Sequence, residues 1–190
     1  MRYPSDQKAK AKQAILQAGA AALRTNGFNG IGVDGLAASA GVTSGAFYSN
    51  FPNKAALLDE VIAACVGEPF IDTENGSLAE RQHRLREYLA MYISAVHRAD
   101  PATGCVMPTL SADVARADPQ IRVTYQRKML ELVSKMSNVL GGPASERDQH
   151  AWSIVAMMVG AIAIARAMPD GDAADRALDA ALQTAIALID

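Results

Sequence analysis

The sequence of 190 residues has few of the features that mark secreted, metal-binding or membrane proteins. Its two cysteines, Cys65 and Cys105, cannot build a disulfide framework, and neither belongs to a CxxC pair that would indicate structural zinc. The N-terminus has no apolar signal-peptide core, and the most apolar run, residues 152–165, falls short of the ~20 residues that cross a bilayer. These absences predict a cytoplasmic protein without a metal site, cofactor or membrane span.

Aromatic residues make up only 5 % of the chain, whereas alanine is abundant and half of all residues are hydrophobic. Alanine loses no side-chain entropy in a helix, so the composition predicts an all-α fold. The net charge is only −2, yet residues 1–54 carry six basic and two acidic side chains against twelve and eighteen in residues 55–190. A basic N-terminal part is typical of a protein that meets an anion there, although chance among so few charges can give the same numbers.

Apolar periodicity and helix-breaking residues predict the order of the helices. The first is expected from Ser5, as its cap, to Asn26, and two short ones follow over residues 33–40 and from Thr43 to before Pro52. Later helices are expected from Lys54 to about residue 66, over 77–99, from Pro119 to about residue 140, over 145–169 and over 173–189. Residues 104–114 are ambiguous, because Pro108 disfavours an ordinary helix through them. No alternating strand pattern occurs.

The most informative stretch is VDGLAASAGVTSGAFYSNF, residues 33–51. Leu36 and Ala37 give its first short helix an inner face, Phe47 and Phe51 do the same for the second, and Gly41 allows the sharp turn between them. This pattern predicts a helix-turn-helix, in which the first helix braces the second and the second is presented to a groove.

The outer face of that second helix has small or hydrogen-bonding side chains and no carboxylate: Thr43, Ser44, Ala46, Tyr48, Ser49 and Asn50. Lys54, at the start of the next helix, adds a positive charge suited to a phosphate. A surface that enters a crowded, negatively charged groove needs small donors and no acidic groups. The stretch therefore predicts binding to duplex DNA.

Over residues 15–62 the sequence resembles the TetR family of transcriptional regulators, through the first helix ending in NGF, the AGV turn, and the spacing of Gly45, Phe47, Tyr48, Phe51 and Lys54. Residues 104–119 also look like a segment of one branch of that family. The resemblance implies a three-helix DNA-binding head over residues 1–53 and an α-helical ligand-binding and dimerisation body over 54–190. It further implies a homodimer, and a repressor that a small ligand releases from DNA.

The resemblance also implies roles for individual positions. Those that look like phosphate contacts are Thr43, Tyr48, Asn50 and Lys54, and those that look like positions facing base edges are Ser44, Gly45, Ala46 and Ser49. Gly32, Ser44 and Asn50 depart from the family, which often has a hydroxyl residue, a lysine and a histidine there. These departures weaken the charge of the interface and leave the operator sequence open.

A dimer is also expected on physical grounds, because one short helix makes few base contacts, whereas two placed ~34 Å apart read a palindrome. The expected interface lies on the last two helices and comprises Ile154, Met158, Ala161, Ile162, Ala165, Leu178, Leu182 and Ile186. The alternative is that these faces pack inside one subunit.

A pocket for a mostly apolar effector is expected among side chains of the central helices: Met91, Tyr92, Met107, Met129 and Trp152. Ordinary core packing explains the same residues. The candidates for reading a charge on the effector are Arg122, Arg127 and His97.

Other functions remain as alternatives. Cys105 could sense an oxidant or electrophile, but a small buried thiol is the simpler interpretation because nothing basic is adjacent. An enzyme using Cys105 and His97 lacks a group to orient the base, and the scattered histidines match no metal-binding spacing. A helical protein- or membrane-surface-binding module would instead use the basic segment 8–12.

Overall fold

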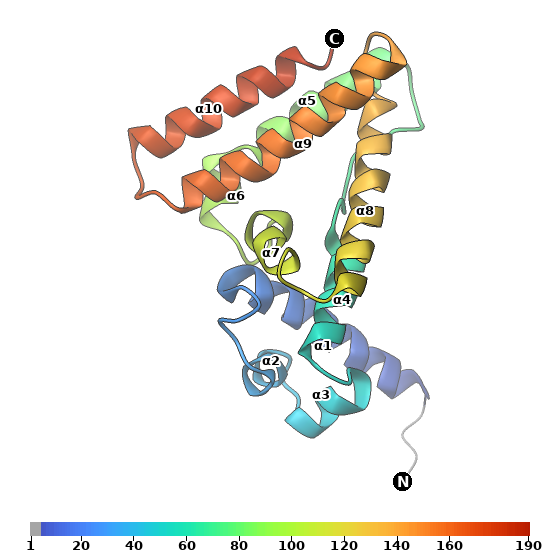
Figure 1. The fold of residues 1–190 in the computed structure, drawn as a ribbon, viewed down its shortest axis with the longest axis vertical. Helices are drawn as coiled ribbons and strands as arrows, with labels where there is room; N and C mark the ends of the chain where they lie inside the picture. The colour runs from blue at the N-terminus through green and yellow to red at the C-terminus, as the bar shows by residue number, and fades with distance from the viewer. Residues whose placement is uncertain (1–4) are drawn as a thin grey trace. The chain divides into compact units, whose positions relative to one another are not determined.

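The computed structural model describes the backbone of residues 5–190 and the side chains from Lys8 onward (Figure 1). Within that range every regular element is an α-helix, which confirms the all-α prediction. The helices are α1 (Ser5–Asn26), α2 (Val33–Ser39), α3 (Ser44–Asn50), α4 (Lys54–Cys65), α5 (Leu78–Tyr92), α6 (Ala95–Ala99), α7 (Met107–Val114), α8 (Pro119–Ser137), α9 (Ala144–Arg166) and α10 (Asp172–Ala187). The expected Ser5 cap and the charges of Arg2 and Asp6 lie outside the described side chains.

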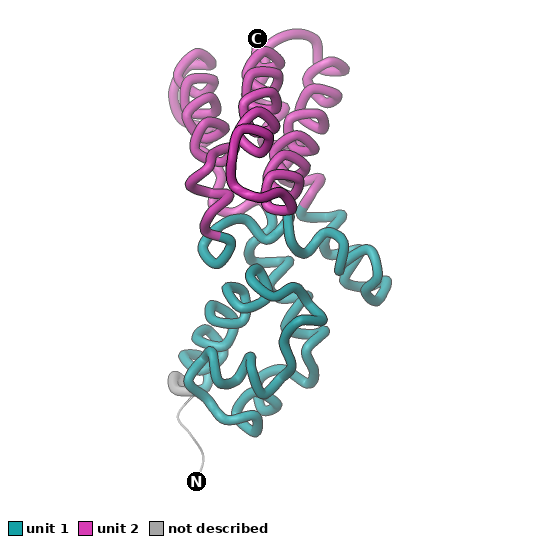
Figure 2. Tube along the Cα trace, turned by 90° about the vertical axis from the view of Figure 1, so that its left-hand side faces the viewer, with its two compact units in different colours: residues 1–66, 101–128 teal, residues 67–100, 129–190 magenta. Residues whose placement is uncertain are grey.

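The chain forms two compact units, which Figure 2 shows in different colours. Unit 1 comprises the chain up to Val66 together with Pro101–Lys128, and unit 2 comprises Gly67–Asp100 together with Met129–Asp190. Helix α7 and the first part of α8 therefore belong to the same unit as α1–α4. The division of function between residues 1–53 and 54–190 stays a prediction.

In unit 1, α1 packs against α2, α3, α4 and α7. Leu23, Leu36 and Phe47 are completely buried in its core, as is Leu57 of α4. Gly19 lets α4 come close to α1, because a Cβ at that position would lie 2.8 Å from Cδ2 of Leu57. The helix-turn-helix thus stands on a dense apolar base.

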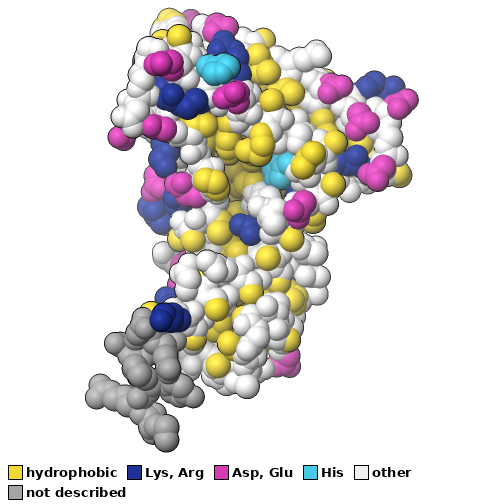
Figure 3. All heavy atoms as spheres, turned by 180° about the vertical axis from the view of Figure 1, so that it is seen from behind, with side chains coloured by type: hydrophobic (Ala, Val, Ile, Leu, Met, Phe, Trp, Pro, Cys, Tyr) yellow, Lys and Arg dark blue, Asp and Glu magenta, His cyan; other side chains and the backbone are white. Residues whose placement is uncertain are grey.

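In unit 2, α9 packs most extensively against α10, while α5 contacts α10 and α6 contacts α9. Leu85 and Leu89 of α5 and Met158 and Ile162 of α9 are completely buried. In the space-filling view of Figure 3, charged side chains of both signs lie at the edges of unit 2 and apolar side chains gather between them.

Two segments differ from the helices expected from the sequence. The helix expected over 77–99 is divided into α5 and α6, because the Ser94 hydroxyl accepts a hydrogen bond from the backbone N–H of His97 at 3.1 Å and starts a new helix. The ambiguous segment contains α7, which tolerates Pro108 because the proline lies in its first turn, where the missing N–H has no partner to lose.

Helix α9 is the one helix in the described residues that is long and apolar enough, by length and composition, to cross a membrane. The expectation that this apolar run is too short therefore does not hold for the complete helix of 23 residues. Of its most apolar window, 39 % is buried inside the fold. Helix α9 packs one apolar face on α10 and carries a second apolar face, so it is apolar on both sides. Such a helix can reach the apolar content of a membrane span.

Candidate nucleic-acid interface

The second helix of the helix-turn-helix, α3, is fixed from its inner side. Phe47 and Phe51 are completely buried, with ring centroids 5.7 Å apart. The Thr43 hydroxyl accepts a hydrogen bond from the backbone N–H of Ala46 at 3.1 Å, as expected of the residue that precedes the helix. Gly41 has a φ of +66°, a conformation that glycine adopts without strain. This cap, core and turn hold α3 in one orientation.

The outer side of α3 is open to solvent. Thr43, Gly45, Tyr48 and Ser49 are exposed, and the Tyr48 side chain is 56 % exposed with its ring edge against Phe47. A Cβ at Gly45 would find only the Thr43 hydroxyl within 4 Å, at 3.8 Å. Nothing in the described fold therefore requires a glycine at position 45.

Several polar side chains of α3 bond to their own helix. The Ser49 hydroxyl and the Asn50 amide each donate to the carbonyl of Ala46 at 2.8 Å. The Asn50 Oδ1 atom is buried without a hydrogen-bond partner. These bonds hold the two side chains against the helix, and a ligand would have to compete for them.

The carboxylate of Asp34 lies beside the outer face of α3, which the sequence pattern of α3 did not predict. The Ser44 hydroxyl donates to the Asp34 carboxylate at 2.6 Å, and Asp34 belongs to the first turn of α2. Inspection of α3 alone shows no acidic residue. The spacing of ten residues across the turn is the signal that could have paired them.

Lys54 holds the loop before α2. Its ammonium donates to the carbonyls of Phe28 at 2.6 Å and Ile31 at 3.0 Å, and it lies 4.2 Å from the centroid of the Phe28 ring. The expected phosphate contact would compete with both hydrogen bonds. The structure therefore points to a role in stability for Lys54.

Replacing Lys54 by methionine is expected to lower the free energy of unfolding by about 2 kcal/mol, because two carbonyls lose a charged donor. Thermal and denaturant unfolding measure this effect. Lys8→Met is the matched control for stability alone, since Lys8 is exposed and has no described partner. If the Lys54 variant kept its stability but bound DNA more weakly, the result would instead support a phosphate contact by Lys54.

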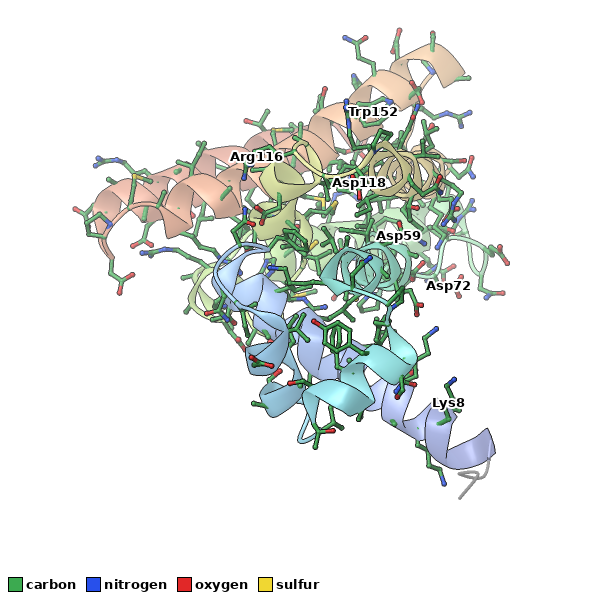
Figure 4. The ribbon with its side chains drawn as sticks, turned by 60° about the horizontal axis from the view of Figure 1, so that its bottom comes forward. Lys8, Asp59, Asp72, Arg116, Asp118 and Trp152 are labelled. Atoms are coloured by element: carbon green, nitrogen blue, oxygen red, sulfur yellow. The ribbon has the colours of Figure 1, made fainter. Side chains whose placement is uncertain are left out.

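Basic side chains of α1 lie close to the end of α3. An open hollow of about 400 Å³ is lined by Lys8, Ala9 and Lys12 of α1 and by Asn50 of α3. Lys12 is paired with Glu60 at 2.8 Å, whereas Lys8, labelled in Figure 4, has no partner among the described residues. The run of alternating lysines at 8, 10 and 12 is the signal for this second basic position.

The five residues of the expected effector pocket do not line either hollow described for this protein. Met107 is buried in unit 1, whereas the other four belong to unit 2. There Tyr92 and Met129 are buried, but Met91 and Trp152 are 59 % and 41 % exposed. Trp152 is labelled on α9 in Figure 4. That pocket stays a prediction.

Most of the residues expected at a dimer interface pack inside unit 2. Six are at most 6 % exposed in the single chain, namely Ile154, Met158, Ala161, Ile162, Ala165 and Leu178, and only Leu182 and Ile186 are half-buried. The exposed apolar side of α9 is a different one. It follows a spacing of four residues, and we call Trp152, Ala156, Gly160 and Ile164 the α9 ridge.

His97 has a structural setting in unit 2. Its Nδ1 atom lies 2.6 Å from the carbonyl of Tyr92, and its ring packs edge-on at 4.5 Å from the Tyr92 ring. Burial lowers the pKa of His97, and burial raises the pKa of the Cys65 thiol. In the part of the chain that the structure describes, no three His, Cys, Asp or Glu side chains form a group that could hold a metal ion.

Comparisons with known proteins agree with this architecture. Residues 15–61 match the family model for bacterial regulatory proteins of the tetR family, and residues 82–181 match that for the tetracyclin repressor-like C-terminal domain. The transcriptional regulator AcuR of Cereibacter sphaeroides is 30 % identical over 155 residues, which cover 74 % of this chain and 68 % of AcuR.

Solved structures show the same fold. A TetR transcriptional regulator from Legionella pneumophila superposes with a TM-score of 0.75 at 17 % identity, over 94 % of this chain and 97 % of that one. A regulatory protein TetR from Rhodobacter sphaeroides gives 0.74 at 20 % identity, over 95 % and 99 %.

Proposed function

This chain belongs to the TetR family of bacterial regulatory proteins, and from that premise we propose that it binds a palindromic duplex as a homodimer and represses transcription until a small effector releases it. It acts in the cytoplasm, and its role requires no catalysis. The observation that carries DNA binding is the open outer face of α3, which the buried Phe47 and Phe51 present to solvent.

Gly45 supports the assignment of that face to a groove. A glycine within a helix costs about 0.5–1 kcal/mol relative to alanine, and the fold leaves open space where its Cβ would be. Close approach of another molecule explains the missing side chain. We propose that Ser44, Gly45, Ala46 and Ser49 face base edges.

Thr43, Tyr48 and Asn50 are our candidates for contacts with phosphate, and Lys8 joins them as an exposed cation beside Asn50. Phosphate contacts orient the protein on the duplex without reading its sequence. Lys54 takes part indirectly, because its ammonium holds the loop that precedes α2.

The α9 ridge supports the homodimer. Trp152 and Ile164 are 41 % and 57 % exposed and form the two ends of the ridge. The small residues Ala156 and Gly160 lie between them. A Cβ at Gly160 would meet nothing within 4 Å in the single chain. Rows at a spacing of four residues pack together when two helices cross, and small residues let their backbones come close. We propose that the ridges of two copies meet.

Duplex binding is tested by incubating the full chain with genomic fragments from its source and sequencing those retained at rising salt. Retention of a palindromic sequence, with affinity that falls as salt rises, supports the proposal. Saturable binding to anionic vesicles without any affinity for DNA would instead support a surface-binding helical module.

Replacing Tyr48 by phenylalanine is expected to weaken binding up to about tenfold on every sequence, because one phosphate hydrogen bond is lost. The fold should be unaffected, since the hydroxyl-bearing ring is largely exposed. Titration of several operator variants measures the effect, with Ser49→Ala as the comparison expected to change sequence preference. A Tyr48 variant that changed only which sequences bind would contradict this division of roles.

A further inference from the structure

A groove of about 520 Å³ lies within unit 1, between α7 and the beginning of α8. Arg116 and Asp118, labelled in Figure 4, mark the turn between the two helices. The groove is open to solvent and mostly apolar, and its lining consists of Ser111, Val114, Ala115, Pro119, Arg122, Val123, Tyr125 and Gln126. A hollow of this size is large enough for a small molecule.

Arg122 is the one charged residue among those that line the groove. It is exposed, and its guanidinium forms no hydrogen bond or ion pair with the described residues. Tyr125 and Gln126 lie three and four residues after Arg122, so both are its neighbours on one face of α8. A guanidinium with free donors is suited to bind a carboxylate through two parallel hydrogen bonds.

A second hydrogen-bond donor, the Tyr125 hydroxyl, belongs to the side-chain contact that joins α7 and α8. The Ser111 hydroxyl lies 2.8 Å from the Tyr125 hydroxyl and also donates to the carbonyl of Met107 at 2.7 Å. Because Ser111 has only one proton to donate, the Tyr125 hydroxyl donates to Ser111. Burial raises the pKa of Tyr125, so this group keeps its proton at neutral pH.

The other side of α7 holds the helix-turn-helix. The Thr109 hydroxyl donates to the carbonyl of Arg24 at 2.9 Å, and the Asp113 carboxylate accepts from the backbone N–H of Phe28 at 2.9 Å. These bonds fix the end of α1 and the loop that leads to α2. A change in the position of α7 therefore acts directly on the element that carries α3.

We propose that this groove is the effector site and that its ligand is a small organic acid with one carboxylate and an apolar tail. The inference rests on the proposed function and deepens it by naming the ligand class. Arg122 binds the carboxylate, and the Tyr125 hydroxyl turns from Ser111 to donate to it. The tail packs on Val114 and Val123. Loss of the Ser111–Tyr125 bond frees α7 from α8 and shifts the loop at Phe28, which lowers affinity for DNA.

Calorimetry on the full chain without DNA tests the site, with hexanoate and benzoate as probes and hexanol and benzyl alcohol as their neutral counterparts. We expect both acids to saturate and both alcohols to bind at least about tenfold more weakly, because a charge-assisted contact is lost. Arg122→Gln should raise the Kd of the acids at least about tenfold, and Tyr125→Phe about three- to tenfold. Arg176→Gln, at an exposed position of α10, should change nothing.

The site is overturned if neither acid saturates, if the alcohols bind as well, or if Arg122→Gln leaves the Kd unchanged while its melting temperature shows an intact fold. Duplex retention with and without acid tests the effector role. If the acid weakens DNA binding by the wild type but not by Arg122→Gln, the effector role is supported. If the acid binds without changing the affinity for DNA, the effector role is overturned. Failure of the proposed function is distinct, because the ligand-free protein would then retain no duplex at all.

Discussion

Leucine in place of Gly45 is expected to lower affinity for duplex DNA at least about a hundredfold, equivalent to roughly 3 kcal/mol. The added side chain would project from the first turn of α3 into the space that we assign to the base edges. The folded protein has room for it, because Gly45 is exposed and its Cβ direction is open. Stability should stay equal or rise slightly, since leucine favours a helix more than glycine does.

Fluorescence anisotropy with a retained duplex measures this loss, and thermal unfolding verifies the fold. Ala64→Leu is the matched control, because it places the same side chain at an exposed position of α4 in the same unit. Gly45→Ala should have an intermediate effect. Full affinity of the leucine variant would show that α3 does not enter the groove at this position.

Glutamate in place of Gly160 is expected to dissociate the homodimer, weakening association at least about a hundredfold, because an unpaired charge buried at an interface costs several kcal/mol. In the single chain this position is open, so the substituted protomer should still fold. DNA affinity should fall with the dimer, since each chain supplies only one copy of α3.

Sedimentation equilibrium over a range of concentrations measures the association. Ala90→Glu places the same charge at an exposed position of α5 and should leave the mass at two chains. Gly160→Ala separates the stability of the helix from the close approach of two copies. Alanine favours the helix by about 1 kcal/mol, while its methyl group adds bulk to the ridge. A glutamate variant that remains dimeric would show that the copies meet elsewhere.

The helix-turn-helix could be predicted from the sequence because its signals are local. Thr43 precedes α3 as a cap, Phe47 and Phe51 recur at helical spacing, and Gly41 permits the turn. The ammonium of Lys54 could not be placed in this way, because its partners Phe28 and Ile31 lie more than twenty residues away. Resemblance indicated a phosphate, whereas the three-dimensional arrangement brings two backbone carbonyls within hydrogen-bond distance.

The expected dimer surface shows a different limit of prediction from the sequence. Helix α9 is apolar on both sides, so its pattern cannot separate the side that packs in the protomer from the side left open. Ile154, Met158 and Ile162, which are expected at the interface from the sequence pattern, are completely buried in unit 2. The structure leaves Trp152 and Ile164 exposed on the other side. Periodicity identifies an apolar face but does not say which neighbour covers it.

Helix α3 carries no basic residue, and the ammonium of Lys54 is already bound to the loop. Each cation that meets a phosphate displaces condensed counterions, and that release drives the attraction of proteins to any stretch of chromosome. In the proposed binding mode α3 itself supplies no such cation, so the attraction to random DNA falls to other residues such as Lys8. The contribution of α3 to the binding energy then comes mainly from the bases.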